Sequence, residues 1–367
     1  MPAPPATNES TKVTELLTAY QLPDEIPFGV EMAPVMYQAE YRNGAWQTGA
    51  LVPYGDIPVN PASTALQFAQ QAFEGMKAYK GAHESPVLFR PDRNWRRFGR
   101  SATRLRMPEV PAHLFADALS AVVNAMSEFV PAGRGQSLYL RPTLFGMDNH
   151  FALRGSDRFL FILLASPSDA YYASPIRVMI ERENCRAARG GTGAEKVGGN
   201  YAASIQANEN CVAHGFDQSL WLDPSLGKNI EELSAMNVMA VIDDTLHTPQ
   251  LSGSLLEGVT RDSLLALATH LGTETHARAM PVDELLSDIE AGRCSELFAC
   301  GTGAIVAPIA AIGEADGREW PLTDVGRRSA VMRDALLDIQ EGRADDPFGW
   351  VIPAADKETL AEYLASA

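Results

Sequence analysis

The sequence predicts an α/β protein of two domains. Its 367 residues are too many for one ordinary hydrophobic core. Strand-like apolar runs alternate along the chain with stretches of helical periodicity, an order typical of the α/β class. The expected strands are 86–89, 137–142, 159–165 and 176–180, and the expected helices are 62–77, 112–130, 201–214, 261–271 and 325–341. Lys77 falls in the first of these helices, which predicts a solvated or structural lysine.

One segment rich in Ser and Pro interrupts both patterns. Residues 166–175, SPSDAYYASP, predict an interdomain loop. We therefore expect a small N-terminal α/β domain over 25–165 and a larger C-terminal cofactor-binding domain over 176–367. Residues 1–24 begin with a Pro-rich stretch and predict a disordered or loosely attached tail. Because ligand sites favour domain interfaces, the interdomain loop is also a candidate wall of the active site.

The composition is that of a soluble globular protein, with 46% hydrophobic and 21% charged residues. A net charge of −16 disfavours nucleic acid or an anionic membrane as a partner. The apolar run 159–165 is too short to span a bilayer. The first ten residues lack a signal-peptide pattern, and the four cysteines form no CxxC pair. These features predict a cytoplasmic protein without a metal site or a disulfide framework.

A single lysine stands between two glycine-rich runs in GGTGAEKVGGNY, residues 190–201. A phosphate-binding P-loop needs Gly before the lysine and Ser or Thr after it, whereas Glu195 and Val197 flank Lys196. A dinucleotide fingerprint is not present either, since the GTG at 301–303 lacks the third glycine. Taken alone, the stretch fits both an ordinary exposed turn and a reactive amine that a bulky cofactor must reach.

The stretch GGTGAEKVGGNYAAS resembles the signature of the branched-chain amino-acid aminotransferases, pyridoxal-phosphate enzymes of fold type IV. Five further stretches agree in the same order: FEGMKAY (73–79), LFRP (88–91), SLYLRPTL (137–144), GVTR (258–261) and LLDIQEGR (336–343). The resemblance covers the chain from about residue 25 to its C-terminus. It implies a two-domain fold type IV enzyme, with a small α/β N-terminal domain and a larger C-terminal α/β pseudo-barrel domain, that works as a homodimer.

The resemblance implies a site for pyridoxal 5′-phosphate. Lys196 would form the imine with the cofactor and shuttle the proton, which needs an amine whose pKa is lowered from about 10.4. The family pattern Glu-x-Gly-x-Met-Asn selects Glu232 to hold the proton of the pyridine nitrogen, and leaves Glu231 as a solvated neighbour. Tyr201 would donate its hydroxyl to the ring oxygen O3′. The phosphate would be bound by Arg90, by the amides of Val259 and Thr260 at a helix N-terminus, and by Thr302.

The same resemblance implies a substrate site. Tyr139 and Arg141 are two residues apart on an expected strand, so both point to one face. In the family the Tyr helps fix the α-carboxylate or walls the pocket, and the Arg meets the distal carboxylate of glutamate. Phe73 would belong to the aliphatic pocket. The N–H groups of a turn would bind the α-carboxylate, namely those of Gly301, Thr302 and Gly303.

The implied reaction is transamination of leucine, isoleucine and valine with 2-oxoglutarate, giving branched 2-oxo acids and L-glutamate. Ser234 and Ala235 stand where the family often has glycine, and Phe68 stands where animal members carry a tyrosine, so the preferred substrate is open. Alternatives of the same fold are a D-amino-acid or specialised amine aminotransferase and an aminodeoxychorismate lyase. A non-catalytic ligand-binding protein on this scaffold is disfavoured because Lys196 and Glu232 are both present.

Overall fold

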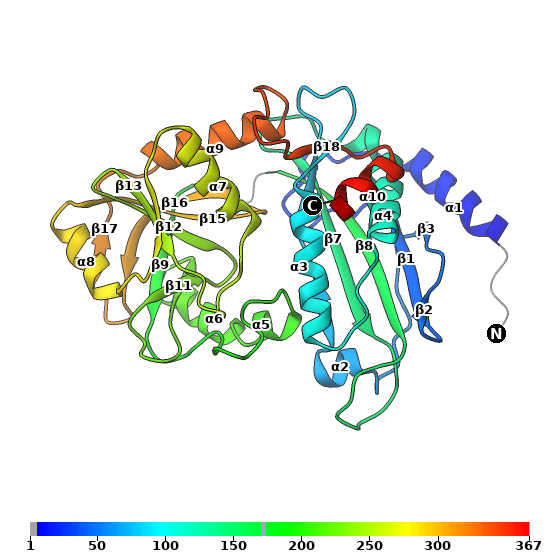
Figure 1. Cartoon of the computed structure of the whole chain (residues 1–367), viewed down its shortest axis with the longest axis horizontal. Helices are drawn as coiled ribbons and strands as arrows, with labels where there is room; N and C mark the ends of the chain where they lie inside the picture. Colours follow the sequence, from blue (N-terminus) through cyan, green and yellow to red (C-terminus); the bar gives the residue numbers. More distant parts are fainter. Residues whose placement is uncertain (1–5, 170–173, 367) are drawn as a thin grey trace. The chain divides into compact units, whose positions relative to one another are not determined.

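A computed structural model describes residues 6–169 and 174–366 of the chain, which divides into two compact units (Figure 1). The first unit comprises residues 1–171 and 338–367, and the second comprises 172–337. The last thirty residues, expected in the C-terminal domain, therefore belong to the first unit. Part of the expected interdomain loop, 170–173, lies outside the described residues. Its first residues do not form a loop, because strand β8 (Phe159–Ser168) continues through Ser168.

The first unit is built on a nine-stranded antiparallel sheet. Its strand order is β18-β6-β5-β7-β8-β1-β2, with β3 paired to β1 and β4 paired to β7. The strands besides β8 are β1 (Val35–Arg42), β2 (Ala45–Trp46), β3 (Ala50–Pro53), β4 (Gln71–Phe73), β5 (Met76–Tyr79), β6 (Val87–Phe89), β7 (Ser137–Gly146) and β18 (Val351–Pro353). The long central pair β7 and β8 is in register over ten residues, which fixes the positions of Tyr139 and Arg141 on β7.

The helices of the first unit pack beside this sheet. They are α1 (Ala6–Ala19), α2 (Thr64–Phe68), α3 (Pro91–Arg104), α4 (Ala112–Ala125), the 3-10 turn η1 (Ser127–Phe129) and α10 (Lys357–Ser366). Helix α10 packs against α4 and α3 (Figure 1). Helix α1 falls in the expected loosely attached tail, yet it contacts β3 and β1 and buries Val13 to 7% exposure. The tail prediction was therefore wrong for residues 6–19, and residues 1–5 lie outside the described part.

The expected helix 62–77 is mostly strand. Helix α2 ends at Phe68 because Ala69 adopts a left-handed backbone conformation with φ 51°. Every residue from 72 to 79 is buried, so no polar alternation marks β4 and β5, and the apolar spacing resembles that of a helix. Lys77 lies in β5 opposite Tyr139 and is only 2% exposed, which makes the solvated interpretation wrong.

The C-terminal segment joins the first unit through backbone pairing and a buried carboxylate. Strand β18 pairs with β6. Glu341, 1% exposed, accepts hydrogen bonds from the amide of Gly135 at 2.7 Å and from Arg134 at 3.0 Å. The backbone of Gly81 comes so close that a Cβ there would lie 2.5 Å from the Glu341 carbonyl oxygen. These contacts explain why the motif LLDIQEGR belongs to the first unit from Asp338 onward, although helix α9 (Arg327–Gln340) begins in the second.

The second unit holds a mixed nine-stranded sheet in the order β11-β10-β9-β16-β15-β12-β13-β14, with β17 paired to β16. Its strands are β9 (Ile176–Glu181), β10 (Gln218–Leu222), β11 (Ile230–Leu233), β12 (Asn237–Ile242), β13 (Thr245–Pro249), β14 (Thr275–Arg278), β15 (Cys294–Gly301), β16 (Ile305–Gly313) and β17 (Glu319–Pro321). Although β11 and β12 lie far apart in the strand order, they contact each other. The sheet is therefore curled, as expected of a pseudo-barrel.

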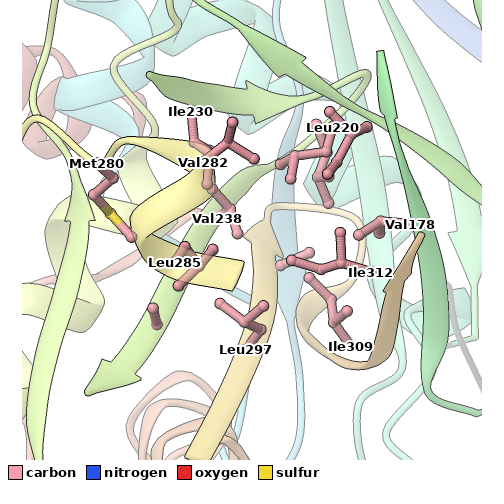
Figure 2. Close-up of a cluster of buried hydrophobic side chains, with 14 of the residues drawn as sticks. Val178, Leu220, Ile230, Val238, Met280, Val282, Leu285, Leu297, Ile309 and Ile312 are labelled. Atoms are coloured by element: carbon pink, nitrogen blue, oxygen red, sulfur yellow. The ribbon is translucent and has the colours of Figure 1, made fainter. Parts of the chain in front are cut away.

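The core of the second unit fills the curl of this sheet. Helix α8 (Val282–Glu290) supplies Val282 and Leu285, which point toward side chains of the strands (Figure 2). The strand residues Ile230, Leu220 and Val238 lie around them, each at most 3% exposed. The other helices are α5 (Gly198–Ala202), α6 (Ile205–Ala213) and α7 (Val259–His270). Among the residues that the model describes, no helix is both long and apolar enough to cross a membrane.

Candidate active site

Lys196 lies at the end of a compact loop, just before α5, and is half-buried. Its Nζ donates a hydrogen bond to the hydroxyl oxygen of Tyr201 across 2.7 Å, and Nζ lies 5.1 Å from the centre of the same ring. The amine and the phenol that the resemblance implies are therefore in direct contact. Helical geometry brings Tyr201 back toward the lysine, since the short helix begins between them.

Asn200 fixes the shape of the lysine loop. Its side chain is buried and its Nδ2 donates to the carbonyl oxygens of Thr192, at 2.7 Å, and Glu195, at 2.9 Å. The hydroxyl of Thr192 donates in turn to Oδ1 of Asn200 at 2.7 Å. The amide thus satisfies three polar groups of the loop that leads to Lys196. Sequence reasoning missed this residue, although it stands inside the quoted motif.

The glycines around Lys196 have separate structural reasons. Gly190 has φ +81°, a conformation that residues with a Cβ rarely adopt. At Gly193 a Cβ would lie 2.3 Å from the carbonyl oxygen of Ser254 and 2.4 Å from Cβ of Ala187. A Cβ at Gly199 would meet no atom within 4 Å. Turn geometry and close backbone packing thus account for Gly190 and Gly193, while Gly199 faces open space.

Glu232 is a buried carboxylate, 4% exposed, at the end of β11. It forms an ion pair of 2.6 Å with Arg186 and accepts hydrogen bonds from the amide of Leu256, at 3.2 Å, and from Nδ2 of Asn237, at 3.1 Å. Burial raises the pKa of Glu232 to about 7, although the positive charge of Arg186 and, more weakly, that of Lys196 act in the opposite direction. The carboxylate therefore lies within the electrostatic reach of the lysine.

The sequence predicted a solvated Glu231, and this prediction was wrong. It is 4% exposed, and its carboxylate accepts hydrogen bonds from the hydroxyls of Ser252, at 2.8 Å, and Ser254. Successive residues of a strand point to opposite faces, so Glu231 and Glu232 belong to different environments. Both faces of β11 are buried, which explains why Glu231 is buried although the sequence predicted a solvated residue. A polar residue in a strand sequence does not by itself show whether its face is buried or exposed.

Helix α7 presents an uncapped N-terminus. The helix begins at Val259 after Gly258, and no side chain caps it, so Thr260 is its second residue rather than its N-cap. The first-turn amides of Val259 and Thr260 are therefore of the kind that binds a phosphate. Gly258 is needed for packing, since a Cβ there would lie 2.0 Å from Oδ1 of Asn237. Asn237 also donates to the carbonyl oxygen of Leu256 at 3.0 Å, which links this helix start to Glu232.

The turn at 301–303 lies beside the turn that joins β11 to β12. Strand β15 pairs Cys300 with Asn237, and a Cβ on Gly301 would lie 3.3 Å from Cγ of Met236. Thr302 and Gly303 continue the turn and are half-buried. The predicted turn of the α-carboxylate site and Glu232 therefore belong to one region of the second unit.

The fold accommodates Ser234 and Ala235, the two residues that differ from the family pattern after Glu232. The buried indole of Trp221 donates a hydrogen bond to the hydroxyl oxygen of Ser234 at 3.0 Å. Ala235 is exposed. The hydroxyl that replaces glycine thus satisfies a buried N–H group of the neighbouring strand β10.

In the first unit, Phe73, Tyr139 and Arg141 form a single cluster, as the strand period predicts. Nη2 of Arg141 donates to the hydroxyl oxygen of Tyr139 at 3.0 Å, and the guanidinium lies 5.0 Å from the ring centre of Phe73. The ring of Phe28 packs edge-on against Tyr139 with centroids 4.7 Å apart. Phe28 was missed because nothing local marks a residue in the irregular segment before β1. Nε of Arg141 is buried without a hydrogen-bond partner among the described residues, which suits an anionic ligand.

Arg90 also belongs to the first unit and occupies a strained position. Its backbone has φ 47° at the start of α3, where its amide donates to the carbonyl oxygen of Trp350 at 2.8 Å. The guanidinium lies 4.8 Å from the centre of the Trp350 ring, and the residue is 8% exposed. Such strain in a residue with a Cβ is typical of functional positions. Phe68, by contrast, is 39% exposed at the end of α2.

The chemistry of the second unit fits pyridoxal 5′-phosphate. The cofactor has an aldehyde, a ring oxygen, a ring nitrogen and a phosphate. The unit supplies an amine in contact with a phenol, a buried carboxylate whose pKa is about 7, and an uncapped helix N-terminus. Sequence reasoning missed two residues that organise these groups, Arg186 and Asn237, because their partners are distant or depend on the strand pairing.

Comparisons with known proteins agree with this chemistry. A family model described as amino-transferase class IV matches residues 71–312. The branched-chain-amino-acid aminotransferase of Mycolicibacterium smegmatis is 39% identical over 335 residues, which cover 88% of this chain and 91% of that relative. A probable branched-chain-amino-acid aminotransferase of Streptomyces coelicolor is 41% identical over 331 residues, with the same two coverages of 88% and 91%.

Solved structures of such enzymes share the fold. The branched-chain amino acid aminotransferase of Escherichia coli matches with a TM-score of 0.70 and 25% identity, covering 88% of this chain and 100% of that one. The enzyme from Thermobaculum terrenum, solved in its PLP-form, matches with a TM-score of 0.71 and 22% identity, covering 88% and 99%. The expected two-domain fold class is thereby confirmed. The chain therefore belongs to the class IV aminotransferases, a family of pyridoxal-phosphate enzymes, and within it to the branched-chain-amino-acid aminotransferases.

Proposed function

We propose that this protein transfers the amino group of leucine, isoleucine or valine to 2-oxoglutarate, giving the branched 2-oxo acid and L-glutamate. The observation that carries the proposal is the contact of Lys196 with Tyr201 in the same unit as the buried carboxylate of Glu232. The curated relatives named above carry the name of this activity. We further propose that the enzyme works in the cytoplasm as a homodimer.

Lys196 supplies the amine and the base of the reaction. Pyridoxal 5′-phosphate, when bound, supplies an aldehyde and an electron sink that makes the Cα proton of the substrate acidic. Lys196 Nζ would take this proton from Cα of the substrate and deliver it to C4′ of the cofactor. Tyr201 orients Nζ through the 2.7 Å hydrogen bond, and its hydroxyl is the group that would bind the ring oxygen.

Glu232 would hold the proton on the ring nitrogen of the cofactor. A carboxylate suits this task only while it stays ionised, and a nearby cation favours the ionised form. The protonated ring nitrogen would pair with the carboxylate of Glu232 in a buried site. The attraction between the two opposite charges is stronger there than in water. The amides of Val259 and Thr260, the side chain of Thr302 and the guanidinium of Arg90 would bind the phosphate.

The substrate site combines apolar and cationic groups. Phe73 and Tyr139 offer aromatic surface to a branched side chain, and Arg141 offers a guanidinium to the distal carboxylate of glutamate. The half-reactions need both kinds of group, because the side chain is apolar in one substrate and acidic in the other. The amides at 301–303 would bind the α-carboxylate that every substrate shares.

A donor and acceptor screen with the purified holoenzyme tests the proposal. We expect turnover of L-leucine, L-isoleucine and L-valine with 2-oxoglutarate, and formation of L-glutamate. D-alanine and aminodeoxychorismate serve as the competing substrates. Turnover of either of these two without turnover of the branched L-amino acids would replace the proposed function by a D-amino-acid aminotransferase or a lyase. Holoenzyme that turns over none of these substrates would contradict the proposal.

A further inference from the structure

Arg186 connects three parts of the second unit through a single nitrogen. Its Nη2 forms the 2.6 Å ion pair with Glu232, donates to the carbonyl oxygen of Gly193 at 3.1 Å, and donates to the carbonyl oxygen of Ser254. Both members of the ion pair are buried, with side-chain exposures of 7% and 6%. A buried cation is costly unless it is paired, so its position between these oxygens is fixed by its partners.

The contact with Gly193 reaches the loop that carries the lysine. Gly193 is three residues before Lys196, and its backbone packs directly against Ser254, which leaves no room for a Cβ. Ser254 also donates its hydroxyl to Glu231. Movement of Arg186 would therefore change the position of the carboxylate and of the lysine loop together.

We propose that Arg186 is a positioning residue that keeps Glu232 ionised and holds its carboxylate in register with the loop of Lys196. The inference deepens the proposed function and rests on it, because it assumes that Glu232 serves the ring nitrogen of the cofactor. Arg186 touches neither substrate nor reacting atoms in this role. It acts through the carboxylate.

Removal of the guanidinium moves a proton. Without the cation, the carboxylate of Glu232 becomes more basic and takes the proton from the ring nitrogen, so the ring loses the charge that draws electrons from Cα. The total number of protons in the pair is unchanged. Cofactor affinity and kcat then fall, whereas KM for leucine stays within about twofold, because the binding groups for the substrate are not altered.

The test compares Arg186→Met with Arg186→Lys, and uses Arg189→Met as the matched control. Arg189 lies in the same loop and is exposed. Cofactor dissociation constants are measured by fluorescence titration of the cofactor-free protein between about pH 6 and 9, together with its melting temperature. We expect Arg186→Met to weaken cofactor binding and lower kcat by about 10- to 100-fold, as loss of a partner behind a site ligand does. Affinity is lost as the pH is lowered and Glu232 takes up a proton. In Arg186→Met, the pH at which half of the affinity is lost should be about 1 to 3 units higher than in the wild type.

The lysine variant separates charge from shape. Arg186→Lys keeps a cation beside Glu232, but on a shorter and more flexible side chain that holds the carboxylate less firmly, so its affinity falls while its pH midpoint stays near that of the wild type. Arg189→Met should match the wild type in both. A lower melting temperature in Arg186→Met with an unchanged pH midpoint would overturn the inference, because a purely structural role predicts that result.

A double variant keeps the test valid if Arg186→Met does not fold. Arg186→Met/Glu232→Gln removes both charges and leaves no buried unpaired ion. If Arg186 acts through Glu232, the double variant binds the cofactor as well as Glu232→Gln alone. A further loss of about 10-fold in the double variant would contradict the inference. Turnover of the wild type is judged separately, so failure of the proposed function is recognised before any variant is compared.

Discussion

The amine of Lys196 donates a hydrogen bond to the hydroxyl of Tyr201 over 2.7 Å. The bond restrains a long, flexible side chain and places its nitrogen beside the only group of Tyr201 that can ionise. Tyr201→Phe removes the hydroxyl and keeps the ring. We expect kcat to fall by about 10- to 100-fold, since a hydrogen bond to a charged group contributes about 1.5–3 kcal/mol. Steady-state kinetics checks this value, and activity equal to wild type would exclude a role for the bond.

Arg141 should distinguish acidic from apolar substrates. Its guanidinium lies over Phe73, and its buried Nε has no hydrogen-bond partner among the described residues. We expect Arg141→Met to raise KM for 2-oxoglutarate by about 10- to 100-fold, because a charge-assisted bond to the distal carboxylate is lost. KM for leucine should change much less.

The control for this change is Arg42→Met, which removes an arginine from the same unit whose side chain is 52% exposed. It should leave both KM values unchanged, since exposed ion pairs contribute little. An equal rise of both KM values in Arg141→Met would show that Arg141 supports the site as a whole and does not select the acidic substrate.

Gly193 and Gly199, which lie on opposite sides of Lys196 in the sequence, should respond differently to substitution by alanine. Gly193→Ala forces a Cβ to within 2.3 Å of a backbone oxygen, so we expect a loss of about 1–3 kcal/mol in stability. Gly199→Ala meets open space in a helix and should not destabilise the protein. Denaturant unfolding of the cofactor-free variants measures both. If Gly199→Ala alone weakened cofactor binding, clearance for the cofactor would be the reason for that glycine.

Burial raises the pKa of Glu232 to about 7 from the ordinary value of 4.5. The folded cofactor-free protein therefore keeps a proton that the unfolded chain releases. Its contribution to stability is complete below pH 4.5 and is lost as the pH rises through about 7. Between about pH 5.5 and 8.5, wild type should lose about 2 kcal/mol relative to Glu232→Gln, which cannot titrate. Unfolding curves at the two pH values measure this difference, and parallel behaviour of the two proteins would contradict it.

Much of the fold follows from local patterns in the sequence. The expected helices at 112–130 and 261–271 correspond to α4 with η1 and to α7, and the expected strands at 137–142 and 159–165 correspond to β7 and β8. Residues 62–77 were misassigned because burial on both faces removes the alternation that marks a strand. The attachment of the C-terminal segment was not predictable, because strand β18 finds its partner β6 more than 250 residues earlier in the chain.

The site shows the same division between local and long-range information. Lys196 and Tyr201 are five residues apart, and Tyr139 and Arg141 are two apart, so local geometry was enough to bring each pair together. Arg186 is 46 residues from Glu232, and only the folded chain shows that the two are paired. Even the burial of Glu231 depends on loop residues that follow β13.

The central claim is that Lys196 binds the cofactor covalently. Borohydride reduction of the holoenzyme, followed by peptide mass spectrometry, tests it most directly. Lys77, 2% exposed in β5, is the internal comparison, because it is a lysine in another of the quoted motifs. We expect a pyridoxyl group on the peptide that contains Lys196, and none on that peptide in Lys196→Ala. A pyridoxyl group on Lys77 or another lysine, with Lys196 unmodified, would contradict the account.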